Sequence, residues 1–282
     1  MSLKRFRAFR DAQVWKSISR RGYTDTPRNR ALAVLNNVFM HLHPVKLPRS
    51  ACSWSFTWGM GGISFYLFLL LTLTGVLLMF YYTPSARDAY WDMKDFEFTV
   101  PFGLFLRNLH RWAGHLMVIT VWLHMLRVFM TGAYKKPREF NWVVGVILLV
   151  TTLLLSFTGY LLPWDQLGFW AITVGTNMAR ATPLIGHEGP LGREMGFTPY
   201  NDIRFALLGG STVGQAALLR AYVWHCIGLP LIAVIFLGVH FWRVRKDQGI
   251  SYRSVASSVL ARDRSEMRRE VQTAPESNSG QS

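Results

Sequence analysis

The sequence predicts an all-α transmembrane protein, organised as a four-helix bundle. Half of its 282 residues are apolar, and no Asp, Glu, Lys or Arg occurs within 50–86, 140–164 or 221–242. Each interval exceeds the roughly 20 residues that a helix needs to cross a bilayer. A fourth apolar segment, 102–131, is interrupted by a few arginines. Open sheets are excluded because their edges cannot be satisfied in lipid.

We expect the spans at 57–82, 102–131, 141–161 and 221–242. Residues 31–43 have helical apolar spacing and predict an amphipathic helix on the membrane surface, ended by Pro44 and Pro48. The long link 162–220 should contain interfacial helices, because aromatic and apolar side chains recur there at helical spacing and Trp is favoured at the interface. The residues that carry this pattern are Trp164, Phe169, Trp170 and Ile172.

The net charge of +15 is distributed in alternating links. Residues 1–50 hold eleven Lys/Arg and two acidic residues, and the links after the second and fourth spans are also basic. The positive-inside rule therefore places both termini in the cytoplasm. We divide the chain into a cytoplasmic segment with the amphipathic helix (1–50), the bundle (51–253) and a cytoplasmic tail (254–282). Attraction to anionic headgroups accounts for the basic links, so no nucleic-acid partner is expected.

Two pairs of histidines lie within the second and fourth spans. His110 and His124 are 14 residues apart, and His225 and His240 are 15 apart. Both intervals return to within about 40–60° of the same helix face and separate the residues by roughly 21–22 Å along the axis. Because both spans run outward to inward, His110 and His225 should face each other as an outer pair. His124 and His240 should form an inner pair.

Two bis-histidine haem sites explain these pairs better than the alternatives. A lone buried histidine is often a packing residue, as we expect for His115, and a bare metal site is a second alternative. Ionisable groups inside the membrane are costly and usually functional. Two pairs at matching depths therefore favour two b-type haems, whose iron would be bound by His110 and His225 on the outer side and by His124 and His240 on the inner side.

Glycines repeat the histidine interval on the two remaining spans. Gly61 and Gly75 are 14 residues apart in the first span, as are Gly145 and Gly159 in the third. A flat macrocycle between four helices requires close backbone approach, which glycine permits. Close packing of small residues between helices is the alternative explanation.

Arginines at the ends of the second span are candidates for binding haem propionates. Arg107 and Arg111 lie at membrane depth without an evident acidic partner, and arginine pairs well with carboxylates. Arg127 follows His124 by three residues and could act likewise on the inner side. Arg220, before His225, is a weaker candidate, and both Arg127 and Arg220 could instead extend to the interface.

The two cysteines, Cys52 and Cys226, have no close spacing and no CxxCH motif. They support neither a disulfide framework nor c-type haem attachment by that motif.

These features resemble cytochrome b of the quinol–cytochrome c and quinol–plastocyanin oxidoreductases, over about residues 31–253. The split, plastid-type form is the most similar, in which the four-helix half is a separate chain. The matching motifs are His110-Arg111-Trp112, Lys135-Lys136-Pro137-Arg138-Glu139, Gly159-Tyr160-Leu161-Leu162-Pro163-Trp164-Asp165-Gln166, and Gln248-Gly249-Ile250-Ser251 after His240.

The resemblance implies a low-potential outer haem, a high-potential inner haem, and a quinol-oxidation pocket near Phe157, Tyr160, Trp170 and Val174. It further implies quinol as substrate, a Rieske iron–sulfur protein and a c-type cytochrome as partners, and a dimeric complex. An insertion around Glu188–Ala206 and the long C-terminal extension depart from the plastid form, so we expect a bacterial cytoplasmic membrane. The family's Pro-Glu-Trp-Tyr loop does not occur here, so a subunit with the remaining cytochrome b helices should provide it. Gly59 stands where the split form attaches a third haem through cysteine, which makes a covalent third haem doubtful.

Two other functions also fit a bundle with paired histidines. A di-haem membrane anchor would conduct electrons for a peripheral dehydrogenase or hydrogenase without an outer quinol pocket. A transporter with functional histidines would need broken helices or inverted repeats, which the sequence does not show. The Pro163–Gln166 run and the expected outer interfacial helix favour the quinol oxidoreductase.

Overall fold

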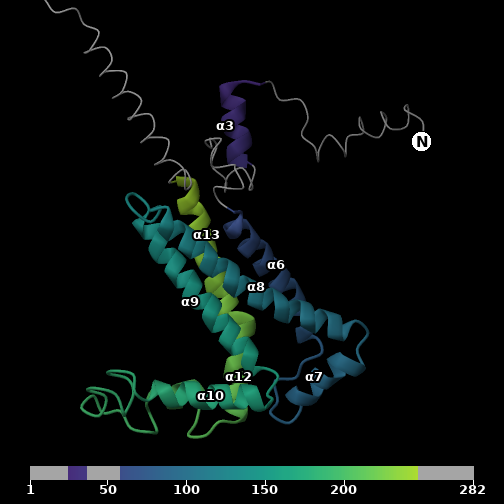
Figure 1. Ribbon diagram of the computed structural model, residues 1–282, viewed down its shortest axis with the longest axis vertical. Helices are drawn as coiled ribbons and strands as arrows, with labels where there is room; N and C mark the ends of the chain where they lie inside the picture. Colours follow the sequence, from purple (N-terminus) through teal and green to yellow (C-terminus); the bar gives the residue numbers. More distant parts are fainter. Residues whose placement is uncertain (1–24, 37–57, 247–282) are drawn as a thin grey trace, which may run out of the picture.

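The computed structural model describes residues 25–36 and 58–246, and within them the regular structure is entirely helical (Figure 1). Four helices are long and apolar enough to cross a membrane, which confirms the predicted fold class. They are α6 (Met60–Met79), α8 (Gly103–Met130), α9 (Glu139–Leu161) and a fourth helix that runs through α12 (Gln215–Val223), η2 (Trp224–Gly228) and α13 (Leu229–Lys246).

The bundle is held by pairwise helix contacts, chiefly α6 with α8, α9 with α13 and α8 with α9. Large apolar side chains point outward along every span, for example Tyr66, Leu73 and Val234. An exposed apolar surface of this extent would be unfavourable in water, and it suits a protein whose helices are surrounded by lipid.

The fourth helix begins at Gln215, six residues before the predicted start, and contains a π-helical turn at Trp224–Gly228. Pro230 explains the turn, because a proline has no N–H to donate to the carbonyl of Cys226 one turn earlier. The N–H of Leu229 bonds instead to the carbonyl of Trp224, five residues back. The wider turn contains His225, and π-turns in helices often occur at functional sites.

Three further helices lie in the links from α6 to α8 and from α9 to α12, which the sequence analysis assigned to the outer side and which are called the outer links below. α7 (Ala89–Phe98), which the sequence analysis did not predict, lies in the first outer link, and α10 (Gln166–Ala179) crosses the end of the bundle as the expected interfacial helix (Figure 1). The Asp165 carboxylate caps α10 by accepting a hydrogen bond from the backbone N–H of Gly168 at 2.8 Å. A buried cluster joins α10 to α9, α12 and the short helix α11 (Ile203–Leu208); it comprises Leu161, Ile172, Leu208, Ala217 and Ala221.

The first helix that the structure describes starts earlier than the sequence predicts. α3 (Pro27–Asn36) begins four residues earlier than expected, with Pro27 at its first position and the Thr26 hydroxyl accepting the N–H of Asn29. Residues 37–43, which the analysis also assigned to this helix, lie outside the described residues. The same holds for the predicted domain limits at 50 and 253.

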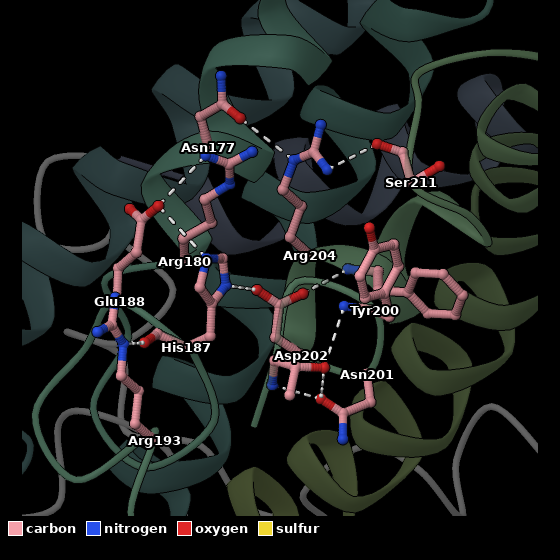
Figure 2. A network of polar contacts seen from close by, with 12 residues as sticks. Asn177, Arg180, His187, Glu188, Arg193, Tyr200, Asn201, Asp202, Arg204 and Ser211 are labelled. Atoms are coloured by element: carbon pink, nitrogen blue, oxygen red, sulfur yellow. Dashed lines mark hydrogen bonds and ion pairs between the residues drawn. The ribbon is translucent and has the colours of Figure 1, made fainter. Parts of the chain in front are cut away.

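A polar network anchors the loop between α10 and α11 (Figure 2). The His187 ring hydrogen-bonds to the buried carboxylate of Asp202, which also caps α11 by accepting the N–H of Phe205 at 2.8 Å. Glu188 pairs with Arg180 at 3.3 Å, at the end of α10. The loop is thus tied to α10 and α11 at the outer end of the bundle.

We expect Asp202→Asn to loosen this loop at neutral pH. Asparagine can still cap α11, but it lacks the charge that holds His187, and a weakened buried polar contact costs about 1–3 kcal/mol. Hydrogen exchange in 184–203 should therefore accelerate about tenfold or more. Glu194→Gln, an exposed acidic residue of the same loop, is the control. Equal exchange in the two variants would contradict the prediction.

The same network predicts a pH dependence. Burial alone would raise the pKa of Asp202, but the N–H of Phe205 and the ring of His187 together lower it below the ordinary 3.8. A depressed pKa means that the carboxylate stabilises the folded loop above pH 3.8. This stabilisation is lost as the pH falls further, through the folded-state pKa.

Candidate functional site

The four membrane histidines meet in two facing pairs, as the 14- and 15-residue intervals predict. In the outer pair, the ring centroids of His110 and His225 are 6.3 Å apart and their planes are at 76°. In the inner pair, the centroids of His124 and His240 are also 6.3 Å apart, with planes at 81°. Each pair joins α8 to the fourth helix, so the two pairs lie at different depths between the same two helices.

This spacing fits a metal ion held between two imidazoles. Metal–imidazole nitrogen bonds of about 2 Å on each side would place the two ring centroids roughly 6 Å apart. Within 25–36 and 58–246, no group of three or more His, Cys, Asp or Glu side chains is arranged to hold a metal ion. Two axial imidazoles alone are the ligand set that suits an iron whose other ligands come from a macrocycle.

Hydrogen bonds fix the orientation of the outer pair. Nδ1 of His225 lies 3.0 Å from the carbonyl oxygen of Leu155, which can only accept, so this nitrogen carries the proton. Nδ1 of His110 lies 2.8 Å from the hydroxyl of Thr74, whose own hydrogen is donated to the carbonyl of Leu70 at 2.7 Å. Both rings therefore keep Nε2 unprotonated and available to bind metal.

The inner pair has a different surrounding. Nδ1 of His240 is buried and has no hydrogen-bond partner in the part of the chain that the structure describes. The ring instead meets the edge of Phe241, with centroids 6.2 Å apart.

The predicted glycines lie against the histidine rings in three of four cases. A Cβ added at Gly61 would lie 3.3 Å from Cε1 of His124, one at Gly75 would lie 3.2 Å from Cε1 of His110, and one at Gly159 would lie 2.5 Å from Cε1 of His225. Gly145 differs, since its nearest side chain is Met125. Glycine thus allows the backbone of α6 and α9 to approach the imidazole edges.

The environment of Arg107 differs from the prediction. Its guanidinium forms an ion pair with Glu97 of α7, a partner that the sequence analysis missed because α7 was not predicted. The hydrogen bond from Lys94, opposed by burial and assisted by Arg107, keeps the pKa of Glu97 below its ordinary value. Arg107 therefore has an acidic partner within the chain, and Arg111, whose side chain is exposed, remains the better outer candidate for a propionate.

Arg127, the candidate on the inner side, and Arg220 lie against an aromatic ring and a glycine, respectively. Arg127 lies over the ring of Trp58, 4.9 Å from its centroid, close to the N-terminus of α6. The guanidinium of Arg220 packs on Gly209, where an added Cβ would meet it at 1.9 Å.

The four residues predicted for the outer quinol pocket occupy an open face of α9 and α10. Phe157, Tyr160, Trp170 and Val174 are each 40–57% exposed, and the Phe157 ring lies against Gly175 of α10. A pocket of about 390 Å³ lies at the N-terminal end of α10, next to Trp170; it is lined by Tyr90, Trp164, Asp165, Gln166 and Phe169. The sequence analysis did not predict Tyr90 as a lining residue, because α7 is distant in sequence from the other residues of this pocket.

The fold and the paired histidines define a multi-pass membrane protein of the b-type cytochrome class. The chain belongs to the cytochrome b/b6 family: the family described as Cytochrome b/b6/petB matches residues 45–248. Cytochrome b6 of the alga Gracilaria tenuistipitata var. liui is 41% identical over 191 residues, which cover 68% of this chain and 82% of that protein. Cytochrome b6 of Heliomicrobium gestii is 41% identical over 192 residues, or 68% of this chain and 83% of that protein.

A solved structure titled "Hyperthermophilic respiratory Complex III" has a similar fold, with a TM-score of 0.63 and 26% identity. The similarity covers 79% of this chain and 53% of that one, so the chain spans about half the length of this structural relative. The predicted resemblance to cytochrome b is therefore confirmed.

We expect Gly159→Ala to displace the outer histidine pair. Its Cβ would lie 2.5 Å from Cε1 of His225, and a contact under 3 Å forces the ring to move. The reduced-minus-oxidised absorption of b-type haem should fall by about half, with the inner site retained, since overpacking of a tight site costs about 1–3 kcal/mol or more. Gly62→Ala, where nothing lies within 4 Å of the added atom, is the control. Full absorption in Gly159→Ala would contradict this reading.

Proposed function

We propose that the chain is the di-haem cytochrome b subunit of a membrane quinol oxidoreductase, with a c-type cytochrome or a plastocyanin-like protein as the acceptor. The observation that carries the proposal is the two imidazole pairs at 6.3 Å. Membership in the cytochrome b/b6 family supports it, because that family implies haem b. Each pair of histidines would hold one haem b.

The chain's own residues position the electron-transfer path. The carbonyl of Leu155 holds the proton on Nδ1 of His225, which directs Nε2 of that ring toward His110. The helices keep all four histidines partly buried, and burial of a haem site is one of the factors that set its redox potential. The bound haems would supply one-electron redox chemistry, and their order across the bundle gives electrons a route from the outer quinol site to the inner quinone site. Proton release outside and uptake inside then contribute to proton translocation.

The open face of α9 and α10 supports an outer quinol site that a partner completes. Phe157, Tyr160, Trp170 and Val174 are exposed apolar or aromatic groups, of the kind that binds a quinone ring. We propose that a subunit with the remaining cytochrome b helices covers them, and that a Rieske iron–sulfur protein accepts the first electron at this face. Gly59 has no thiol, so a covalently attached third haem is not part of the proposal.

The complex would lie in a bacterial cytoplasmic membrane, as a dimer with both termini of this chain in the cytoplasm. The alternation of basic links supports the orientation. Purification of the native complex, with subunit identification and a pyridine haemochrome count, tests the assignment. A Rieske protein and two non-covalent haems per chain would support it. A dehydrogenase or hydrogenase partner without a Rieske protein would overturn it in favour of the membrane anchor.

We expect His124→Leu to remove one haem and leave the other. The substitution deletes one of the two imidazoles that would hold the inner haem, so that His240 remains without its counterpart. The haemochrome count should fall from two to one per chain, while His115→Leu, whose ring meets Trp112 at its edge, should keep both. Two haems in His124→Leu would contradict the bis-histidine assignment.

We expect Trp170→Leu to slow quinol oxidation about tenfold, because a misplaced substrate reacts much more slowly, while the haem content stays the same. Stopped-flow reduction of haem by quinol measures the rate. Trp122→Leu, an equally exposed tryptophan on α8 away from this face, is the control. Equal slowing in both variants would show that the effect is not specific to the outer site.

A further inference from the structure

The two helices that face the outer histidines carry the same short motif, Leu-x-x-Thr-Gly. It occurs as Leu71 to Gly75 in α6 and as Leu155 to Gly159 in α9. At the inner depth, the residues before the two spaced glycines are Met60 and Val144, which have no hydroxyl. The motif therefore distinguishes the outer depth from the inner one.

Each copy of the motif surrounds one outer imidazole in the same way. In α9, Nδ1 of His225 lies 3.0 Å from the Leu155 carbonyl and 3.3 Å from the Thr158 hydroxyl, and Gly159 lies against Cε1. The Thr158 hydroxyl donates its own hydrogen to backbone carbonyls, at 2.8 Å to Leu154 and 3.2 Å to Leu155. Its oxygen is thus left to accept from the ring.

The copy in α6 reproduces this arrangement around His110. Nδ1 lies 2.8 Å from the Thr74 hydroxyl, and Gly75 lies against Cε1. Thr74 donates to the carbonyls of Leu70 and Leu71 at 2.7 and 3.2 Å. The two copies of the motif, 84 residues apart in sequence, therefore place a threonine hydroxyl and a glycine against each outer ring.

The inner pair lacks this support on at least one side. Nδ1 of His240 is buried without a hydrogen-bond partner within the described residues. An imidazole whose N–H is hydrogen-bonded is a stronger donor to its metal, and a stronger donor stabilises the oxidised iron. The two sites should therefore differ in potential even though both use two histidines.

We propose that the paired Leu-x-x-Thr-Gly motifs, through Thr74 and Thr158, lower the midpoint potential of the outer haem relative to the inner one. Both threonines are positioning residues that act on the haem iron through its ligands. The proposal rests on the proposed di-haem function and adds the reason why electrons pass inward. It makes the direction of transfer a property of two hydroxyl groups.

The test is a spectroscopic redox titration of the intact complex carrying Thr74→Val or Thr158→Val. Valine keeps the branched shape and removes the acceptor, so the outer haem should become easier to reduce. We expect the ratio of reduced to oxidised outer haem to rise about three- to tenfold at a fixed potential, where tenfold corresponds to about 59 mV for a one-electron couple. The inner haem should not shift. The low-spin electron paramagnetic resonance signal of the outer haem should move as well, because ring orientation changes.

Matched threonines in the same two helices provide the controls. The hydroxyls of Thr72 and Thr152 donate to the backbone carbonyls of Phe68 and Leu148 at 2.8 Å, each one turn back in its own helix. Thr72→Val and Thr152→Val should leave both potentials unchanged. Thr74→Ser, which keeps the hydroxyl that Thr74→Val removes, should have the same outer potential as the native complex.

The outcomes separate this proposal from the assignment of function. If both haems bind and the outer potential is unchanged in Thr74→Val and Thr158→Val, or shifts equally in the controls, the proposal is overturned and the di-haem function stands. If Thr74→Val loses the outer haem, recovery of haem and potential in Thr74→Ser supports the hydroxyl's role, and failure to recover overturns it. If the native complex holds no pair of b-type haems, the proposed function itself fails.

Discussion

Two imidazole pairs, at two depths of the bundle, link α8 to the fourth helix. This link is the constraint on which the bundle's function depends. Each pair can face a shared metal only if the two histidines of a helix, about four turns apart, lie on the same side of that helix. The 14- and 15-residue intervals differ by one residue, and the two pairs still have the same centroid separation of 6.3 Å. Since the outer histidine of the longer interval lies in the π-turn Trp224–Gly228, a local widening of the helix occurs where the extra residue must be accommodated.

The glycines and threonines of α6 and α9 complete this constraint from the other side. Gly75 and Gly159 let each backbone reach the edge of an outer ring, and the preceding threonine binds its Nδ1. In each helix, the Thr-Gly dipeptide thus leaves space for the imidazole ring and fixes its orientation. At the inner depth Gly61 provides space without a neighbouring hydroxyl, and Gly145 faces Met125, so the two depths differ in chemistry while they share a ligand type.

The sequence predicted the spans and the histidine pairs because both follow from helical periodicity and charge-free length, which are local signals. It did not predict α7, whose mixed composition in a short outer link carries no clear period, and Glu97 and Tyr90 were missed with it. Thr74 and Thr158 were missed for another reason: a threonine that bonds back to its own helix is common. Only the three-dimensional position of the histidine reveals that the threonine oxygen also accepts a hydrogen bond from the ring.

The partition of roles along the outer end follows from these observations. The buried cluster around Leu161 and Leu208 fixes α10 and α11 against the bundle, and the His187–Asp202 pair anchors the loop between them. Phe157 and Trp170, by contrast, lie on the exposed face of the same helices. A platform held in place with an open aromatic face suits the proposed quinol site, in which this chain would supply fixed geometry and a partner subunit would cover the substrate. The polar anchoring lies in the outer link and the electron path lies within the bundle, so each can change without disturbing the other.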